Sequence, residues 1–189
     1  DVIVCSTGVI GMPLPIEPIA LHVKPLAVSL STDGSLLAAK AIMTTDTFPK
    51  NLSVTFELGG KQCVIGGIAK GSGMIHPNMA TMLCFLTTDV CIDSEWLQKA
   101  LKLVADKTFN MISIDGDTST NDMCAIMASG LAGNDEIHGE GPDYEMFVNA
   151  LYALLMNLSR DLARDGEGAT KLLECAVDGA PDETTAKKV

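Results

Sequence analysis

Thr81 is the residue of this sequence best suited to nucleophilic chemistry, provided that the peptide bond before it is cut. A small residue, Ala80, precedes it, and an apolar, strand-like run follows it. A threonine hydroxyl is a weak nucleophile unless a base lies beside it. Cleavage before Thr81 would free its own α-amine, whose pKa of about 7.7–8.0 suits a base near neutral pH. The same pattern also fits a threonine that only begins a strand.

Polar segments, most of them containing glycine, recur where the predicted strands and helices end. They cover residues 6–8, 44–47, 70–73, 115–122 and 165–171. Binding and catalytic residues are often carried by loops of this kind, which a rigid framework holds in place. Each segment alone also fits an ordinary turn, but five of them together predict a site.

Composition excludes several classes of function. The chain has 24 acidic and 13 basic residues and a formal net charge of -11, which argues against binding to a phosphate backbone. No apolar run reaches the roughly 20 residues that a membrane-spanning helix needs. The first residues also lack the basic and long apolar regions of a signal peptide, and a strand-like start without Met predicts a piece of a longer chain.

The residues that bind metals in other proteins are scattered here. The histidines are His22, His76 and His138, and no two of them have the spacing of metal ligands. The acidic residues of segment 115–122 lack the spacing and closing Glu of a calcium loop. The six cysteines form no CxxC pair, so we expect reduced, mostly buried thiols and no metal site.

Periodicity predicts elements that would hold these segments. We expect strands at 2–5, 53–58, 61–69, 81–87, 111–114 and 172–177, and helices at 36–43, 95–108, 144–164 and from 182. Gly59-Gly60 predicts a hairpin turn, and prolines 13, 15, 18 and 25 predict only short helices between them. Hairpins mixed with long helices favour an antiparallel or mixed sheet layered with helices.

Five sequence blocks, in order, resemble one family. KGSGMIHPNMATML (70–83) looks like the processing motif of the ornithine acetyltransferases, the glutamate N-acetyltransferases of the ArgJ family. STGVIG (6–11) resembles that family's oxyanion-hole segment, and AIMTTDTFPK (41–50), DGDTSTND (115–122) and RDGEGATK (164–171) match further blocks. The resemblance therefore covers nearly the whole chain.

The resemblance implies a fold and a division of the chain. The fold is α/β, a layered sandwich with mixed or antiparallel sheets covered by helices, of the ArgJ/DmpA-like, N-terminal-nucleophile type. Residues 1–189 would be one catalytic-core fragment of a protein about twice as long. Self-cleavage between Ala80 and Thr81 would make 1–80 the end of an α chain and 81–189 the start of a β chain.

The resemblance also implies the roles of single residues. Thr81 would be both the new N-terminus and the acetyl-accepting nucleophile, and Thr7 and Gly8 would form the oxyanion hole. Four residues would bind substrate: Thr44, Lys70, Thr81 and Glu167. Lys70 suits the α-carboxylate that ornithine and glutamate share, and Glu167 suits an ammonium group.

The implied activity moves an acetyl group from N-acetylornithine to glutamate by a ping-pong mechanism, and some members also use acetyl-CoA. No cofactor, metal, nucleic acid or membrane is implied. The cut chains would form an α/β heterodimer and then a heterotetramer, in the cytoplasm, or in the mitochondrial matrix or plastid of a eukaryote. Two alternatives remain open: a self-processing aminopeptidase or amidohydrolase, and an inactive structural homologue.

Overall fold

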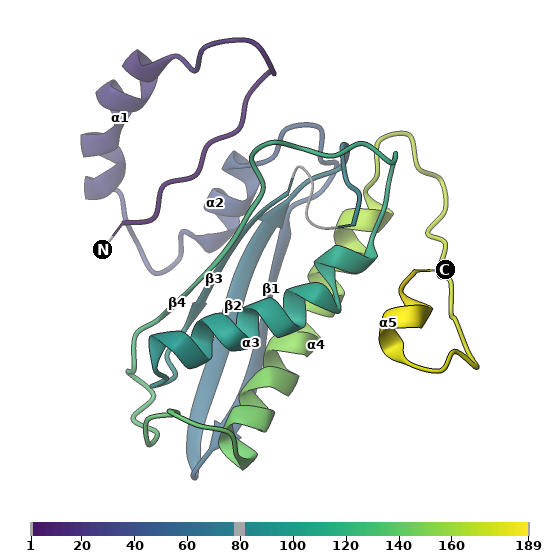
Figure 1. Ribbon diagram of the computed structural model, residues 1–189. Coiled ribbons are helices and arrows are strands. Elements are labelled where there is room, and N and C mark those ends of the chain that lie inside the picture. The colour runs from purple at the N-terminus through teal and green to yellow at the C-terminus, as the bar shows by residue number, and fades with distance from the viewer. Residues whose placement is uncertain (1, 78–81, 189) are drawn as a thin grey trace.

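A four-stranded mixed sheet forms the centre of the computed structural model, which describes residues 2–77 and 82–188 (Figure 1). The strand order is β1-β2-β3-β4, and the bounds are β1 (Lys50–Leu58), β2 (Lys61–Lys70), β3 (Leu83–Thr88) and β4 (Met123–Ala128). The first two neighbouring pairs are antiparallel, and β4 runs parallel to β3. The α/β class and the mixed sheet that the sequence predicts are confirmed.

The β1–β2 hairpin follows from alternation and from its turn. Along β1 the apolar side chains of Leu52, Val54 and Phe56 pack against the core, whereas the polar residues between them are exposed. Gly59 and Gly60 both have positive φ, 52° and 76°, as a two-residue hairpin turn requires. The hairpin is therefore confirmed, with strands slightly longer than predicted.

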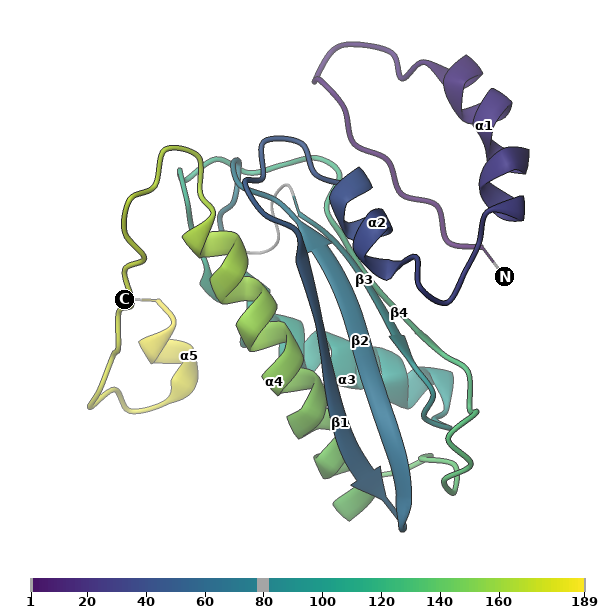
Figure 2. The ribbon, with the colours of Figure 1, turned by 180° about the vertical axis from the view of Figure 1, so that it is seen from behind.

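Two long helices cover one face of the sheet, as the two opposite views show (Figures 1 and 2). α4 (Pro142–Arg164) contacts β1 and β2, and α3 (Ser94–Asp106) contacts α4. The Asp93 carboxylate caps α3 by accepting a hydrogen bond from the Glu95 N–H. On α4, apolar residues at helical spacing are buried against the sheet, among them Phe147, Leu151 and Leu158. Both helices match the predicted segments.

The smaller helices lie outside this layer. α2 (Ser35–Ala41) contacts β1 and β2 and confirms the predicted helix at 36–43. α5 (Glu183–Ala186) begins where the sequence predicts a helix, capped by Asp182, and it is one turn long. α1 (Ile16–Val28) buries none of its residues and stands apart from the sheet in both views (Figures 1 and 2).

Four expectations from the sequence are wrong. α1 has 13 residues although Pro18 and Pro25 lie within it, because a first-turn proline loses no helical bond and Pro25 interrupts only one. Residues 2–5 and 172–177 form no strand, because no neighbouring strand pairs with them within the described residues. Segment 111–114 is no strand either, because Met111 ends a short 3-10 helix, η1 (Phe109–Met111), and residues 112–114 are irregular. By contrast, β4 was not predicted at all.

The cysteines are all free, as expected, but they are less buried than predicted. Cys63 and Cys84 are buried, Cys5, Cys91 and Cys124 are half-buried, and Cys175 is exposed. No helix of the described residues is long and apolar enough to cross a membrane.

Candidate functional site

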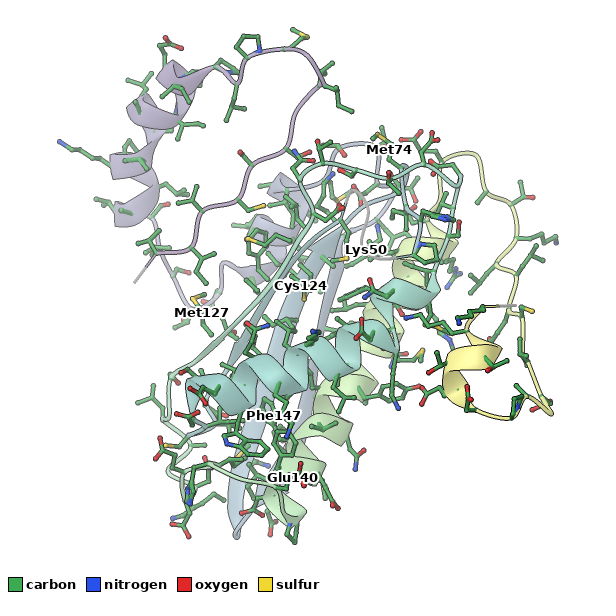
Figure 3. The ribbon with its side chains drawn as sticks, viewed as in Figure 1. Lys50, Met74, Cys124, Met127, Glu140 and Phe147 are labelled. Atoms are coloured by element: carbon green, nitrogen blue, oxygen red, sulfur yellow. The ribbon has the colours of Figure 1, made fainter. Side chains whose placement is uncertain are left out.

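The strand register brings the polar segments to one end of the sheet. Lys50 at the start of β1 pairs with Ala69, and Lys70 at the end of β2 pairs with Leu83, the first residue of β3. Leu83 pairs in turn with Met123, the first residue of β4. The loops that enter or leave these positions therefore meet, and Lys50 and Met74 mark this end in Figure 3.

A buried ion triad lies beneath these loops. The Lys50 ammonium donates to Asp46 Oδ1 at 2.7 Å and to Asp165 Oδ2 at 2.6 Å. The three side chains are 0%, 0% and 2% exposed. One cation thus lies between two carboxylates, so these three side chains together carry a net charge of minus one. We call Asp46, Lys50 and Asp165 the Lys50 triad.

The two carboxylates of the Lys50 triad stay ionised. Burial would raise the pKa of Asp46, but hydrogen bonds from Gly71 N–H, Lys50 and Thr44 N–H outweigh it, so the pKa is lowered. Burial likewise opposes ionisation of Asp165, whose pKa is nevertheless lowered by hydrogen bonds from Lys50 and Thr47. The charged form is therefore the one that the fold stabilises.

Lys70 is the second buried cation of this end. It is 3% exposed, and its ammonium donates to the Thr44 hydroxyl oxygen at 2.9 Å. Within residues 2–77 and 82–188 no carboxylate pairs with it. Because a buried charge is costly unless it is paired, this ammonium suits an anionic ligand.

Glu167 comes to the same place from the end of α4. Its backbone N–H donates to the Ser72 carbonyl at 2.7 Å, and a Cβ atom at Gly73 would lie 3.1 Å from its carboxyl carbon. Ser72 is also hydrogen-bonded, through its hydroxyl, to the Thr45 hydroxyl at 2.6 Å. Segments 44–47, 70–73 and 165–167 thus form one connected group, which includes three of the predicted substrate-binding residues.

Two carboxylates of segment 115–122 hold the chain on either side of the predicted cleavage site. Asp115 accepts hydrogen bonds from the N–H groups of Met74 at 2.6 Å and Ile75 at 3.2 Å. Asp122 accepts one from the Met82 N–H at 2.7 Å. Burial raises the pKa of Asp122, and the Met82 hydrogen bond offsets this only in part. Met74 itself has a φ of 54°, which is rare for a residue with a side chain.

The predicted oxyanion-hole residues lie on the N-terminal arm. Thr7 is half-buried and Gly8 is exposed, and both line an open pocket of about 400 Å³ together with Thr120 and Asn121. The Asn121 amide donates to the Ser6 carbonyl at 3.1 Å. Within the described residues, this contact ties the arm to segment 115–122, and no hydrogen bond joins Thr7 or Gly8 to Lys70.

The comparisons with known proteins decide the family. A model of the ArgJ family matches residues 1–189. The chain belongs to this family. The resemblance found in the five sequence blocks is thereby confirmed.

Individual ArgJ relatives agree with this assignment. The arginine biosynthesis bifunctional protein ArgJ of Symbiobacterium thermophilum is 53% identical over 185 residues, which are 98% of this chain and 46% of that protein. The ArgJ protein of Geobacillus kaustophilus is 51% identical over 188 residues, 100% of this chain and 46% of the relative. A crystal structure of ArgJ from Bacillus halodurans is 53% identical in sequence, with a TM-score of 0.45. The matched part is 46% of this chain and 41% of the Bacillus halodurans chain. This chain spans about half the length of the curated relatives it matches.

Of the predicted ArgJ site residues, the structure brings together Thr44, Lys70 and Glu167. Ala80 and Thr81 lie outside the described residues. The sequence analysis assigned no individual role to four carboxylates and one cation that organise this end: Asp46, Asp115, Asp122, Asp165 and Lys50. All lie within blocks that carry the family resemblance. No group of three or more potential metal ligands occurs among the described residues.

Proposed function

We propose that the protein carrying this chain transfers the acetyl group of N-acetylornithine to glutamate through an acetyl-Thr81 intermediate, in arginine biosynthesis. The relatives are named as arginine biosynthesis proteins. The observation that supports the proposal best is Lys70, a buried ammonium with only the Thr44 hydroxyl as its polar partner in the described residues. Both substrates carry an α-carboxylate that this ammonium would bind.

The proposed reaction has two halves. The Thr81 hydroxyl attacks the acetyl carbonyl, its proton passes to the Thr81 α-amine, and the amide bond to ornithine breaks as the leaving nitrogen takes up a proton. The amine of glutamate then attacks the carbonyl of the acetyl-Thr81 ester and gives its proton to the Thr81 α-amine. The ester C–O bond breaks as the Thr81 oxygen takes up a proton, and N-acetylglutamate leaves. Thr7 and Gly8 would donate hydrogen bonds to the oxyanion of each tetrahedral intermediate, and such donors contribute about 3 kcal/mol each in other enzymes.

Self-cleavage between Ala80 and Thr81 is part of the proposal, since it creates the α-amine. Asp115 and Asp122 support it from both sides of the segment, because they hold the backbone of Met74, Ile75 and Met82. A held backbone keeps the reacting groups in a productive geometry, which is where much of an intramolecular rate advantage comes from.

A second acetyl donor is also proposed. The relatives are named bifunctional, and we assign the second activity to acetyl-CoA, which would acetylate Thr81 in place of N-acetylornithine.

After cleavage, the two chains would form an α/β heterodimer and then a heterotetramer. We place the protein in the cytoplasm, where arginine precursors and reduced thiols are both available.

The decisive experiment follows Thr81 by mass spectrometry in the full-length protein. We expect two chains under denaturing conditions, one of which begins at Thr81. With N-acetylornithine alone, that chain should gain the mass of one acetyl group, and glutamate should remove it as N-acetylglutamate. Thr81→Ala should give one uncut chain that takes up no acetyl group.

The alternatives give different results in the same experiment. Transfer of the acetyl group to water instead of glutamate would indicate a self-processing aminopeptidase or amidohydrolase. An uncut parent chain without acetylation would indicate an inactive homologue. Lys70→Met should raise KM for both substrates while cleavage remains complete, and an unchanged KM would contradict the role of Lys70.

A further inference from the structure

The Lys50 triad is a buried ion cluster whose contacts run to the predicted substrate-binding segments. It buries two carboxylates against one ammonium, with side chains at most 2% exposed. Burying such groups costs about as much as their attraction returns, so stability alone gives little reason for the triad. Every described contact of its carboxylates runs to the segments that carry the predicted substrate-binding residues or to Lys50 itself.

Asp46 connects the segments of Thr44 and Lys70. Its Oδ2 accepts a hydrogen bond from the Thr44 N–H at 3.2 Å. Its Oδ1 accepts one from the Gly71 N–H at 2.8 Å and the ion pair from Lys50. Gly71 directly follows Lys70 in the chain, so this single carboxylate fixes the backbone just after Lys70 and the backbone of Thr44, whose hydroxyl oxygen accepts a hydrogen bond from the Lys70 ammonium.

Asp165 connects the same end with Glu167. Its carboxylate accepts hydrogen bonds from the Thr47 N–H at 2.9 Å and from the Thr47 hydroxyl. Glu167 lies two residues further along the chain, and its own N–H donates to Ser72. Asp165 thus ties the chain just after α4 to segment 44–47, two residues before Glu167 contacts segment 70–73.

We propose that the Lys50 triad positions the substrate-binding residues Thr44, Lys70 and Glu167, and so determines how tightly both substrates are held. The inference rests on the proposed function of these three residues. Asp46 and Asp165 are positioning residues, because they act on the backbone of the binding segments and not on substrate. Their loss should therefore appear in KM for both substrates more strongly than in kcat.

The test uses Asp165→Asn and Thr47→Ala in the full-length protein, with kinetics for N-acetylornithine and glutamate. Asn at 165 removes the negative charge that faces the Lys50 ammonium and leaves one acceptor oxygen where Asp165 has two, so the contacts to Lys50 and Thr47 are weakened. We expect KM to rise about tenfold or more for both substrates, since small misplacements of binding groups cost that much. Thr47→Ala removes one side-chain hydrogen bond from an exposed position, and we expect about a threefold rise.

Leu154→Ala is the matched control for lost stability. Leu154 lies in the middle of α4, is 1% exposed and belongs to the hydrophobic core. Its side chain is apolar and takes no part in the described hydrogen bonds and ion pairs of the Lys50 triad. It should lower the melting temperature and leave both KM values near those of the parent. If Asp165→Asn does not fold, Thr47→Ala decides the outcome.

The outcomes separate this inference from the proposed function. An active parent whose Asp165→Asn or Thr47→Ala variant raises both KM values above those of Leu154→Ala supports the positioning role. An active parent whose folded variants match Leu154→Ala in KM overturns that role alone. A parent without acetyl transfer overturns the proposed function, and the positioning role with it.

Discussion

Lys50 pairs with two buried carboxylates at once, so its removal should be costly. The Lys50→Met substitution keeps the length of the side chain but leaves Asp46 and Asp165 buried without a counter-ion. Breaking a buried pair by removing one partner costs about 3–5 kcal/mol in other proteins. We expect a loss of this size in the free energy of unfolding, measured by urea denaturation of the full-length protein.

Arg160→Met provides the control for removal of one positive charge. The Arg160 guanidinium pairs with Glu174 at 2.8 Å, and the two side chains are 50% and 72% exposed. Exposed ion pairs contribute about 0–1 kcal/mol to the free energy of unfolding, so the free energy of unfolding of this variant should remain near that of the parent. Equal stability of the two variants would show that the carboxylates find other partners when Lys50 is lost.

The lowered pKa values of Asp46 and Asp165 predict a pH dependence. Since each pKa is lower in the folded state than its ordinary value of 3.8, each group contributes stability above that pH. The contribution should disappear as the pH falls through the lower folded pKa. Asp122 and Asp161 have raised pKa values and act in the opposite direction.

The measurement is therefore the difference between the parent and Asp46→Asn in unfolding free energy across pH. The difference should have its full size above about pH 5 and should shrink below about pH 4, because Asp46 of the unfolded chain then takes up a proton while Asp46 of the folded protein does so only at a lower pH. A difference that does not depend on pH would mean that Asp46 contributes through packing alone.

Among the secondary-structure elements, β2 shows how closely the sheet and α4 pack. Gly66 and Gly67 are neighbours that face opposite sides of this strand. A Cβ at Gly67 would overlap Leu86 Cδ2 and lie 3.5 Å from Leu158 Cδ1, and both leucines are 0% exposed. A Cβ at Gly66 would meet nothing nearer than 3.9 Å.

These two glycines give a matched pair of substitutions. Gly67→Ala should destabilise the full-length protein by about 1–3 kcal/mol, because the buried leucines must shift in a packed core. Gly66→Ala should be neutral or slightly stabilising, since alanine restricts the unfolded chain more than glycine does. The melting temperatures of the two variants check this, and equal values would contradict the packing explanation.

Secondary-structure elements were predictable where a short stretch of sequence carries the signal by itself. The β1–β2 hairpin and the apolar stripe of α4 meet this condition, because alternation, a Gly-Gly turn and helical spacing are local signals. β4, MCAIMA, has no such alternation and is defined by its pairing with β3. Residues 172–177 look like a strand, but strands need a neighbour, which they lack within the described residues.

The candidate site was predictable to a similar extent. Thr44, Lys70 and Glu167 were predicted from blocks of sequence, and the structure places them in one connected group, while their binding roles stay predictions. The ion pair between Lys50 and Asp165 joins residues 115 positions apart, and no local pattern predicts a contact of that kind. Asp46 and Lys50 lie within one block, AIMTTDTFPK, but residues 46–49 are not helical, so the i,i+4 rule for helices does not predict their ion pair either.

Considered as a whole molecule, the chain places the predicted cleavage site between two halves that are packed into one sheet. β1 and β2 precede residue 80, whereas β3, β4, α3 and α4 follow residue 81. β2 pairs with β3 from Ile65↔Thr88 to Lys70↔Leu83, and α4 packs on β1 and β2. The core likewise joins both halves, with Leu58 and Ile65 from the first and Phe147 and Leu155 from the second.

Cleavage should therefore leave the two chains associated. Separating them would break the hydrogen bonds between β2 and β3 and expose the core between α4 and the β1–β2 hairpin. Exposing apolar surface to water costs a free energy of about 25 cal/mol for each Å². We expect the cut full-length protein to elute from gel filtration as one species of the same size as the uncut Thr81→Ala variant. The two chains should separate only in denaturant, and the same mass analysis that detects the cut would identify them. Separate elution of the chains under native conditions would mean that the sheet between β2 and β3 does not hold the halves together.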